Sequence, residues 1–306
     1  MIVLKQMLVF LIMIIFGLLA RRSGIITKAN QSQFSAMVIN LACPCLILSS
    51  AMTSNERISI GEIGVIFGVL CLLIAIVLLL SWLVPIVMKY PKEEHATVNT
   101  MFWCTNITFI GLPLVQGLYG TAAVIYVTFA IMLVNTLFYS YGVILISRGS
   151  EKKQKFSPKS LLTPGMLSCI AACLVYFLDF PIPDVVETSL TMVGSLTAPL
   201  AMMMIGYGLQ DVNLKDMITD VRLILFTVLK MLVMPILVLL LMKQITNSTY
   251  LLATCLALVA SPTGGMVAML ATLYNPKAYL SVTREVSFTT LAAVITIPVV
   301  AAAIGL

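Results

Sequence analysis

Two short stretches place polar residues, glycine and proline inside apolar sequence that is long enough to cross a membrane. TNITFIGLP covers residues 105–113 and SPTGG covers 261–265. Proline removes a helical N–H donor and clashes with the preceding turn, so we expect both helices to break there. A broken helix exposes backbone ends whose dipoles can hold a carboxylate or an ion, and an asparagine amide can donate to a carboxylate. The candidate binding residues in the two stretches are Thr105, Asn106, Thr108, Gly111, Pro113, Ser261, Pro262, Thr263 and Gly264.

A plainer interpretation is that proline kinks and glycines only serve helix packing, which is common in membrane proteins. We favour binding at Pro113 and Pro262, because polar residues cluster beside them. For Asn106, the alternative to substrate contact is a structural clamp that holds the break together. The plain kink is expected at Pro44, Pro85, Pro199, Pro235 and Pro298.

Three further polar residues inside apolar segments are candidates for the same site. Lys230 lies about 13 Å and Glu285 about 9 Å along their helices, counted at about 1.5 Å per residue from the cytoplasmic ends. A charge at that depth should face a cavity or a partner. We favour Lys230 as the charge that attracts an anionic substrate; the alternative is that Lys230 and Glu285 neutralise each other. Asn135 either lines the site or forms a hydrogen bond between helices.

The elements that position these residues must be membrane helices. Hydrophobic residues make up 60% of the chain and charged residues 10%, and the mean hydropathy is +1.09. No water-soluble domain has that composition. A bilayer core needs roughly 20 apolar residues per helix, and ten such segments follow one another. We therefore predict an all-α polytopic membrane protein with spans at 3–20, 34–53, 63–88, 97–119, 121–147, 161–178, 189–209, 221–242, 250–273 and 279–304.

The lysines and arginines predict the orientation, since short cytoplasmic loops collect them. The loops after odd-numbered spans hold Arg21, Arg22, Lys28, Lys89, Lys92, Arg148, Lys152, Lys153, Lys155, Lys159, Lys215, Arg222, Lys277 and Arg284. The opposite side holds Lys5, Arg57 and Lys243. We expect a multi-pass protein of the cell membrane with both termini extracytoplasmic. This bias explains the net charge of +6 without a nucleic-acid partner.

Weak internal repetition predicts two halves. Residues 40–44 (NLACP) resemble 195–199 (SLTAP), and the same offset aligns 118–120 with 273–275 and 127–128 with 282–283. The halves would be 1–150 and 151–306, with five spans each. Because five is odd, the second half must be inverted in the bilayer, and inverted repeats are typical of transporters. Spans four and nine, which carry the two breaks, would then cross near the midplane.

Other classes of site and function are disfavoured. The seven cysteines lie in apolar segments and the single histidine lies in a loop, so we expect no metal site and no cofactor. A membrane-embedded enzyme would need an HExxH motif or paired aspartates inside a span, and the sequence has neither. A channel or a membrane receptor for a small organic anion stays the alternative to a transporter.

The motifs resemble those of a known family. TNITFIGLPL at 105–114, followed by LYG at 118–120, is similar to the fourth-span crossover of the auxin efflux carrier family. Residues 260–262, 271–275 and 295–298 resemble its second crossover and closing helix, and Lys230 with Pro235 resembles its eighth span. The chain departs from the pattern at Arg284 and Glu285. The short loop between 147 and 161 indicates a compact bacterial-type member.

The resemblance implies a fold akin to that of the bile acid:sodium symporters. Spans one, two, six and seven would form a scaffold, and spans three to five and eight to ten a mobile transport unit. It also implies elevator-type alternating access and carriage of small organic anions. These are mono- or dicarboxylates such as malate or malonate, or auxin-like carboxylates. The implied partners are the anion, a coupling ion that is either a proton or sodium, and the lipid bilayer, with a homodimer as an open alternative.

Overall fold

The computed structural model describes residues 2–53, 58–147, 162–178, 182–208, 217 and 219–306. In these ranges the chain is helical, and its only β-type pairing is an isolated antiparallel bridge between Thr105 and Thr263. The predicted all-α class is confirmed for this part of the chain. The basic loop at 148–159 and the predicted span ends at 161 and 209 lie outside the described residues.

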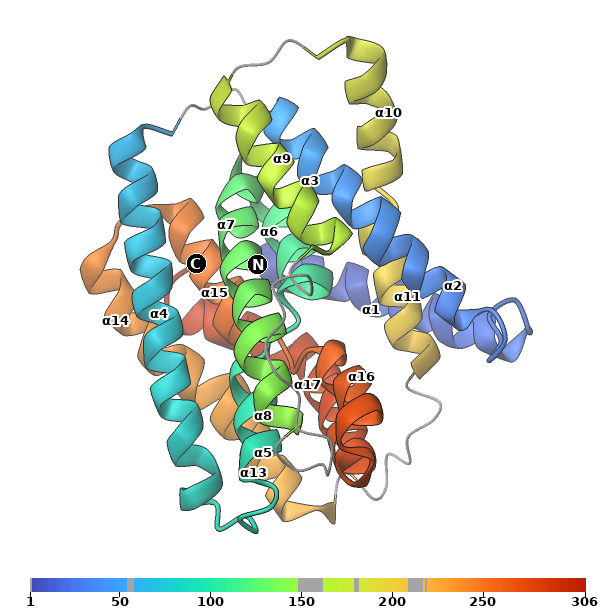
Figure 1. The fold of residues 1–306 in the computed structure, drawn as a ribbon, viewed down its shortest axis with the longest axis vertical. Helices are drawn as coiled ribbons and strands as arrows, with labels where there is room; N and C mark the ends of the chain where they lie inside the picture. Colours follow the sequence, from blue (N-terminus) through green and yellow to red (C-terminus); the bar gives the residue numbers. More distant parts are fainter. Residues whose placement is uncertain (1, 54–57, 148–161, 179–181, 209–216, 218) are drawn as a thin grey trace.

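The first half of the chain contains helices α1 to α8 (Figure 1). Their bounds are α1 (Ile2–Arg22), α2 (Gln31–Met37), η1 (Val38–Ala42), α3 (Cys43–Thr53), α4 (Ile60–Val87), α5 (His95–Trp103), η2 (Ile107–Gly111), α6 (Leu112–Tyr119), η3 (Thr121–Ala123), α7 (Val124–Leu137), η4 (Phe138–Gly142) and α8 (Val143–Ser147). In Figure 1, α4 and the continuous α7–α8 helix run along the long axis, whereas α1 lies across it.

The second half contains α9 to α17. The bounds are α9 (Pro164–Leu178), α10 (Asp184–Gly194), α11 (Thr197–Gly208), α13 (Val221–Val228), η7 (Leu229–Val233), α14 (Met234–Ile245), α15 (Thr249–Ala260), α16 (Gly265–Tyr274), η8 (Pro276–Ala278) and α17 (Tyr279–Ala303). Asp184 and Glu187, which the sequence places in a loop, form the first turn of α10. Acidic side chains are favourable there because the N-terminal end of a helix carries partial positive charge.

Seven of the described helical segments are long and apolar enough to cross a membrane. They are Val3–Arg22, Gln33–Met52, Gly61–Val87, Thr121–Ser147, Asp184–Gly208, Val221–Ile245 and Tyr279–Ala303. Shorter apolar helices cover Ile107–Tyr119, Pro164–Leu178 and Thr249–Ala260. The fold is therefore that of a multi-pass membrane protein. Ten spans in two inverted repeats stay a prediction.

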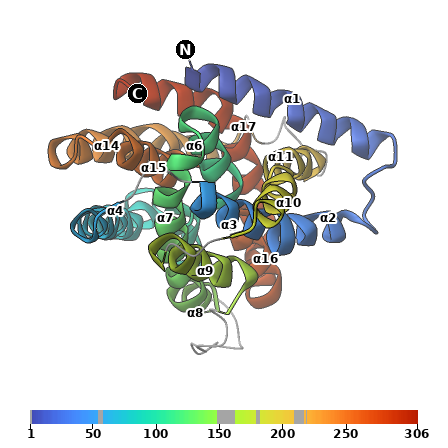
Figure 2. The same ribbon diagram turned by 90° about the horizontal axis from the view of Figure 1, so that it is seen from above.

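Helix α1 packs against both α11 and α17, and α3 packs against α9 and α10. Helix α4 packs against α5, α14 against α15, and α16 against α17. Seen from above, α2, α10 and α11 lie together at one side and α4, α14 and α15 at the other (Figure 2). The division into a scaffold and a transport unit stays a prediction.

Three π-helical turns each end two residues before a proline. The turns η1, η2 and η7 precede Pro44, Pro113 and Pro235 respectively. A proline ring clashes with the carbonyl four residues earlier and supplies no N–H. A wider i to i+5 turn accommodates this defect without ending the helix. Two of these turns hold predicted site residues, because Thr108 lies in η2 and Lys230 in η7.

Helices α1 and α11 touch backbone to backbone at two glycines. A Cβ atom at Gly206 would lie 2.0 Å from the carbonyl oxygen of Ile14, and one at Gly17 would lie 2.0 Å from that of Met203. Both distances are far inside van der Waals contact. Only glycine at these two positions permits this approach.

Gly206→Ala is therefore expected to destabilise the protein. The added methyl group must push the two helix backbones apart, and overpacking of this kind costs roughly 1–3 kcal/mol. Thermal unfolding in detergent measures the effect. Gly68→Ala is the matched control, since a Cβ atom there meets no atom within 4 Å. Equal unfolding temperatures for the two variants would contradict the proposed contact.

Candidate functional site

The two helix breaks lie against each other. Helix α5 ends at Trp103 and α15 at Ala260, and the segments that follow are not helical. The N–H of Asn106 donates to the carbonyl oxygen of Pro262 at 2.8 Å, and the N–H of Gly264 donates to that of Cys104 at 3.0 Å. Non-helical backbone inside a membrane protein must be satisfied by other protein groups. Each break therefore satisfies the other, and we call this pair of segments the crossover.

Small and cyclic residues shape the crossover. A Cβ atom at Gly264 would lie 3.3 Å from both the sulfur of Cys104 and the carbonyl oxygen of Thr105. A Cβ atom at Gly111 would lie 3.1 Å from the carbonyl oxygen of Ala257 on α15. Pro113 follows the π-helical turn η2, whose wider i to i+5 geometry accommodates the proline ring and its missing N–H. These residues set the path of the backbone.

Lys230 binds the C-terminal end of α5. Its Nζ donates to the carbonyl oxygens of Met101 at 2.6 Å and Phe102 at 2.9 Å, and the side chain is fully buried. The last carbonyls of a helix lack intrahelical donors and carry partial negative charge. Thr263 Oγ1 also donates to Met101, at 3.1 Å. The lysine and the second break therefore hold the same helix end.

Glu285 lies close to this end without forming an ion pair with Lys230. Within the described ranges, no salt bridge of 4.0 Å or less joins the two side chains. The hydroxyl of Thr227 donates to Glu285 Oε1 at 3.4 Å, and Glu285 is 3% exposed. One turn along α17, Thr289 Oγ1 donates to the Glu285 carbonyl oxygen at 2.8 Å and accepts from the N–H of Thr263 at 3.2 Å. Thr289 thus links Glu285 to the crossover.

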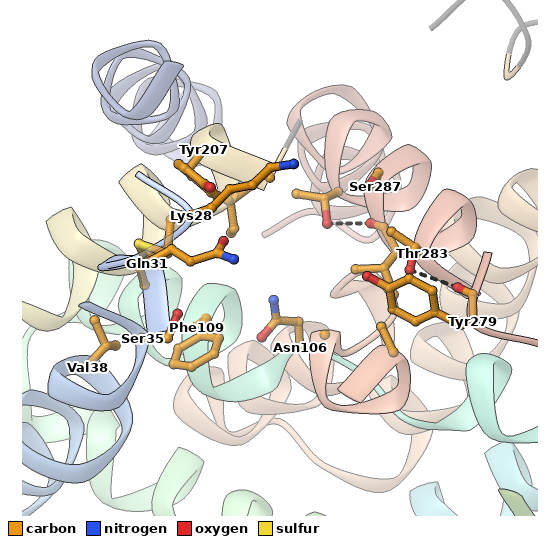
Figure 3. Close-up of a pocket in the computed structure, with 18 residues that line it drawn as sticks. Lys28, Gln31, Ser35, Val38, Asn106, Phe109, Tyr207, Tyr279, Thr283 and Ser287 are labelled. Atoms are coloured by element: carbon orange, nitrogen blue, oxygen red, sulfur yellow. Dashed lines mark hydrogen bonds between the residues drawn. The ribbon is translucent and has the colours of Figure 1, made fainter. Parts of the chain in front are cut away.

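A cavity of about 600 Å³ reaches the crossover from one side, and we call it the main cavity. In Figure 3, Lys28 and Gln31 form one wall, Thr283 and Ser287 form the opposite wall, and Asn106 lies between them. The Asn106 side chain forms no hydrogen bond with a described residue and points into the cavity. Among the described residues that line it, Lys28 carries the only formal charge, and none is acidic.

A second cavity, of about 370 Å³, also borders the crossover and shares Ser35, Asn106, Phe109 and Gly265 with the main cavity; we call it the side cavity. Thr105, Thr108 and Asn135 line it together with Asn106 and Gly264. The buried Thr105 hydroxyl has no hydrogen-bond partner in the described part of the chain. The Asn135 amide makes no hydrogen bond that would join two described helices. Both groups are available to a ligand.

Comparison with known proteins decides the family. A family model described as membrane transport protein matches residues 2–301. The chain belongs to the membrane transport protein family. The resemblance to the auxin efflux carriers is thereby confirmed. Proteins of this family are transporters. No curated protein matches the chain.

In this membrane transport protein, the predicted site residues divide into two groups. Those that line a cavity at the crossover are Thr105, Asn106, Thr108, Asn135 and Gly264. Those that line neither the main nor the side cavity are Gly111, Pro113, Lys230, Ser261, Pro262, Thr263 and Glu285. Ser261 is buried, and its hydroxyl donates to the Ala257 carbonyl at 2.5 Å. Substrate contact stays a prediction for all of them except Lys230 and Glu285, for which other roles are proposed below.

The sequence reasoning missed most of the main-cavity wall of this family member. Lys28 was used only to predict the orientation, and the sequence reasoning did not consider Gln31, Ser35 or Tyr207. One signal was available on α17. Thr283, Ser287 and Thr290 follow the spacing that puts residues on one helix face, and all three line the main cavity.

Proposed function

We propose that the protein is a secondary transporter of small organic anions that works by elevator-type alternating access. The observation that carries the proposal is the main cavity, which reaches the crossover and whose described lining residues carry one formal charge, on Lys28. A cationic group in a cavity without acidic residues favours an anion over a cation or a neutral solute. The unpartnered Asn106 amide supplies a donor for a carboxylate at the inner end.

The helix ends at the crossover support the choice of an anion. The negative C-terminal end of α5 is occupied by the Lys230 side chain. Helix α16 starts at Gly265, which lines both cavities, and no side chain caps its N-terminus. The first N–H groups of a helix lack intrahelical partners and attract anions. We propose that Lys230 acts by holding the crossover rather than by touching the substrate.

The position of the main cavity supports the elevator mechanism. One wall comes from α2 and α11, which belong to the proposed scaffold, and the other from η2, α16 and α17, which belong to the proposed transport unit. Movement of one set of helices along the other would carry a substrate bound at Asn106 across the membrane. Lys28 lies on the scaffold side and Asn106 on the moving side (Figure 3). A dicarboxylate could contact both, whereas a monocarboxylate would need only Asn106.

We further propose that this structure is open to the cytoplasm. The exposed Lys28 and Tyr279 at the cavity rim follow spans one and nine, whose loops are rich in basic residues. Both termini would then be extracytoplasmic. A reporter fused after Leu306 that is active only in the cytoplasm would contradict this orientation and the inverted second half.

Counterflow in proteoliposomes tests the transport proposal. Vesicles containing the purified protein and unlabelled malonate, malate or indole-3-acetate are diluted into the same labelled compound. A carrier gives transient accumulation that saturates with concentration, because internal anion drives exchange through one site. A channel gives only equilibration, and a receptor gives binding without flux. Absence of counterflow for all three compounds would overturn the proposal.

Lys28→Gln is expected to weaken binding of the transported anion, roughly three- to tenfold at low salt, because it removes the charge at the cavity rim. The half-saturating concentration in counterflow should rise, and the difference from the unchanged protein should shrink at high ionic strength. Lys92→Gln, an exposed lysine that lines no cavity described above, is the control. Identical kinetics and salt dependence in the two variants would remove Lys28 from the substrate path.

A further inference from the structure

A third cavity, separate from the main and side cavities, surrounds Glu285. Its volume is about 170 Å³, and we call it the polar cavity. It shares no lining residue with the other two. The cavity has room for a few water molecules, each of which takes about 30 Å³ in the liquid. At its inner end it also reaches Met101, whose carbonyl oxygen binds Lys230.

The rim of the polar cavity is charged and partly exposed. Arg284 Nη2 lies 3.4 Å from Asp220 Oδ2, and their side chains are 33% and 37% exposed. The Arg222 guanidinium lies over the ring of Tyr90, 4.9 Å from its centre. The cavity therefore joins this ion pair and this cation–π contact to a carboxyl group that is itself buried.

We propose that Glu285 binds a coupling proton, which reaches it through the polar cavity. The inference rests on the proposed transport function and adds the coupling ion. A carboxylate that is buried with one hydroxyl contact is costly to keep charged. Gain and loss of a proton at its oxygen, with water in the cavity as donor and acceptor, avoids that cost in one of the two states. No bond other than O–H forms or breaks.

The other titratable groups around Glu285 are either paired with a charge, exposed or already protonated. Lys230 faces Glu285 from η7, and Arg284 lies beside it on α17. The start of α13 contributes Asp220 and Arg222, and the segment before α5 contributes Tyr90 and Glu94. Asp220 is paired with Arg284 and also caps α13 through its side chain. Burial raises the pKa of the Tyr90 phenol above its ordinary value, so that this group keeps its proton. Glu285 is the buried carboxyl group of this set.

Sodium fits the same place less well. Hard cations take several oxygen ligands, and the carbonyl oxygens of Met101 and Phe102 at the end of α5 already bind the Lys230 side chain. Within the described ranges, no group of three or more His, Cys, Asp or Glu side chains could hold a metal ion. The Lys230 side chain supplies a positive group at the helix end where a cation would otherwise bind.

Lys230 and Thr263 connect the charge on Glu285 to the crossover. When Glu285 is protonated, Lys230 is free to hold the two carbonyls of α5. When Glu285 is ionised, it attracts Lys230 away from them. Thr263 lies in the second break. Its hydroxyl donates to the carbonyl oxygen of Met101, and its N–H donates to the hydroxyl of Thr289. These two bonds join the second break to the end of α5 and to α17. A proton at Glu285 therefore changes how firmly the end of α5 is held beside Asn106.

The test compares three modes of transport in proteoliposomes, with labelled malonate and malate as probes. These are counterflow at equal pH, uptake driven by an imposed pH gradient, and uptake driven by a sodium gradient. The unchanged protein is expected to show counterflow and stimulation by the pH gradient only. Glu285→Gln is expected to retain measurable counterflow and to lose the stimulation. Glu187→Gln, on the distant α10, should behave like the unchanged protein.

The outcomes separate the two proposals. Absence of both counterflow and net uptake in the unchanged protein overturns the transport function and, with it, the inference. Counterflow without stimulation by pH, stimulation by sodium instead, or a Glu285→Gln variant that still responds to pH overturns only the inference. If Glu285→Gln fails to fold, Lys230→Gln combined with Glu285→Gln serves in its place. The double substitution removes both buried charges and keeps an amide donor for the carbonyl oxygens of Met101 and Phe102.

Discussion

Asn106→Ala is expected to reduce the affinity for the transported anion about ten- to hundredfold, because a hydrogen bond to a charged group contributes roughly 1.5–3 kcal/mol. The structure makes this a clean test. Asn106 ties the crossover together through its backbone N–H and carbonyl oxygen, which accepts from the N–H groups of Ile110 and Gly111. Alanine keeps all of these bonds. The variant should therefore fold, and binding of labelled malonate or malate in detergent reports the loss.

Asn247→Ala, which removes an exposed amide in the loop before α15, is the matched control and should bind as the unchanged protein does. If Asn106→Ala keeps its affinity, the side chain does not contact the substrate. If Asn106→Ala instead lowers the unfolding temperature, the side chain acts as a structural clamp, which is the alternative role that the sequence allows.

Lys230→Met is expected to destabilise the protein by roughly 3–5 kcal/mol, the range for removing one partner from a buried charged interaction. The carbonyl oxygens of Met101 and Phe102, two buried residues, would lose their charged donor. Thermal unfolding in detergent measures the loss. Lys243→Met is the matched control. That lysine also binds a C-terminal helix carbonyl, of Ile304 at 2.6 Å, but in an exposed position where water can replace it.

Double variants separate the two interpretations of the lysine. If Lys230 and Glu285 formed a simple neutralising pair, Lys230→Met with Glu285→Gln would restore full stability. The structure predicts incomplete recovery, because methionine cannot donate to the two carbonyls. Lys230→Gln with Glu285→Gln should recover more, because an amide can donate. Full recovery in the methionine pair would show that the carbonyl contacts contribute little.

Sequence reasoning located one helix break well and the other only in part. The second break, at 261–264, contains Pro262 and falls within the predicted 261–265. The first break, at 104–106, lies before Pro113, because the π-helical turn η2 keeps the helix continuous at that proline. The span at 121–147 agrees residue for residue with Thr121–Ser147. Composition and local sterics are sufficient for features of this kind.

The partners of Lys230 could not be predicted in the same way. The depth estimate correctly placed Lys230 and Glu285 near each other, but a carbonyl oxygen has no residue type that identifies it in a sequence. The contacts with Met101 and Phe102 depend on how α5 ends and on the π-helical turn that holds Lys230. Lys28 was missed for a related reason, since its position opposite Asn106 depends on the packing of α2 against the distant α11.

The crossover has a consequence for how the family can diversify. Its two joining bonds run between main-chain atoms, from Asn106 to Pro262 and from Gly264 to Cys104, and main-chain atoms survive most substitutions. The groups that face the main cavity are side chains from other helices, such as Gln31, Thr283 and Ser287. Mutations of these side chains therefore leave the main-chain bonds of the crossover intact. Under the proposed transport function, single substitutions could change the solute that is recognised without altering the crossover.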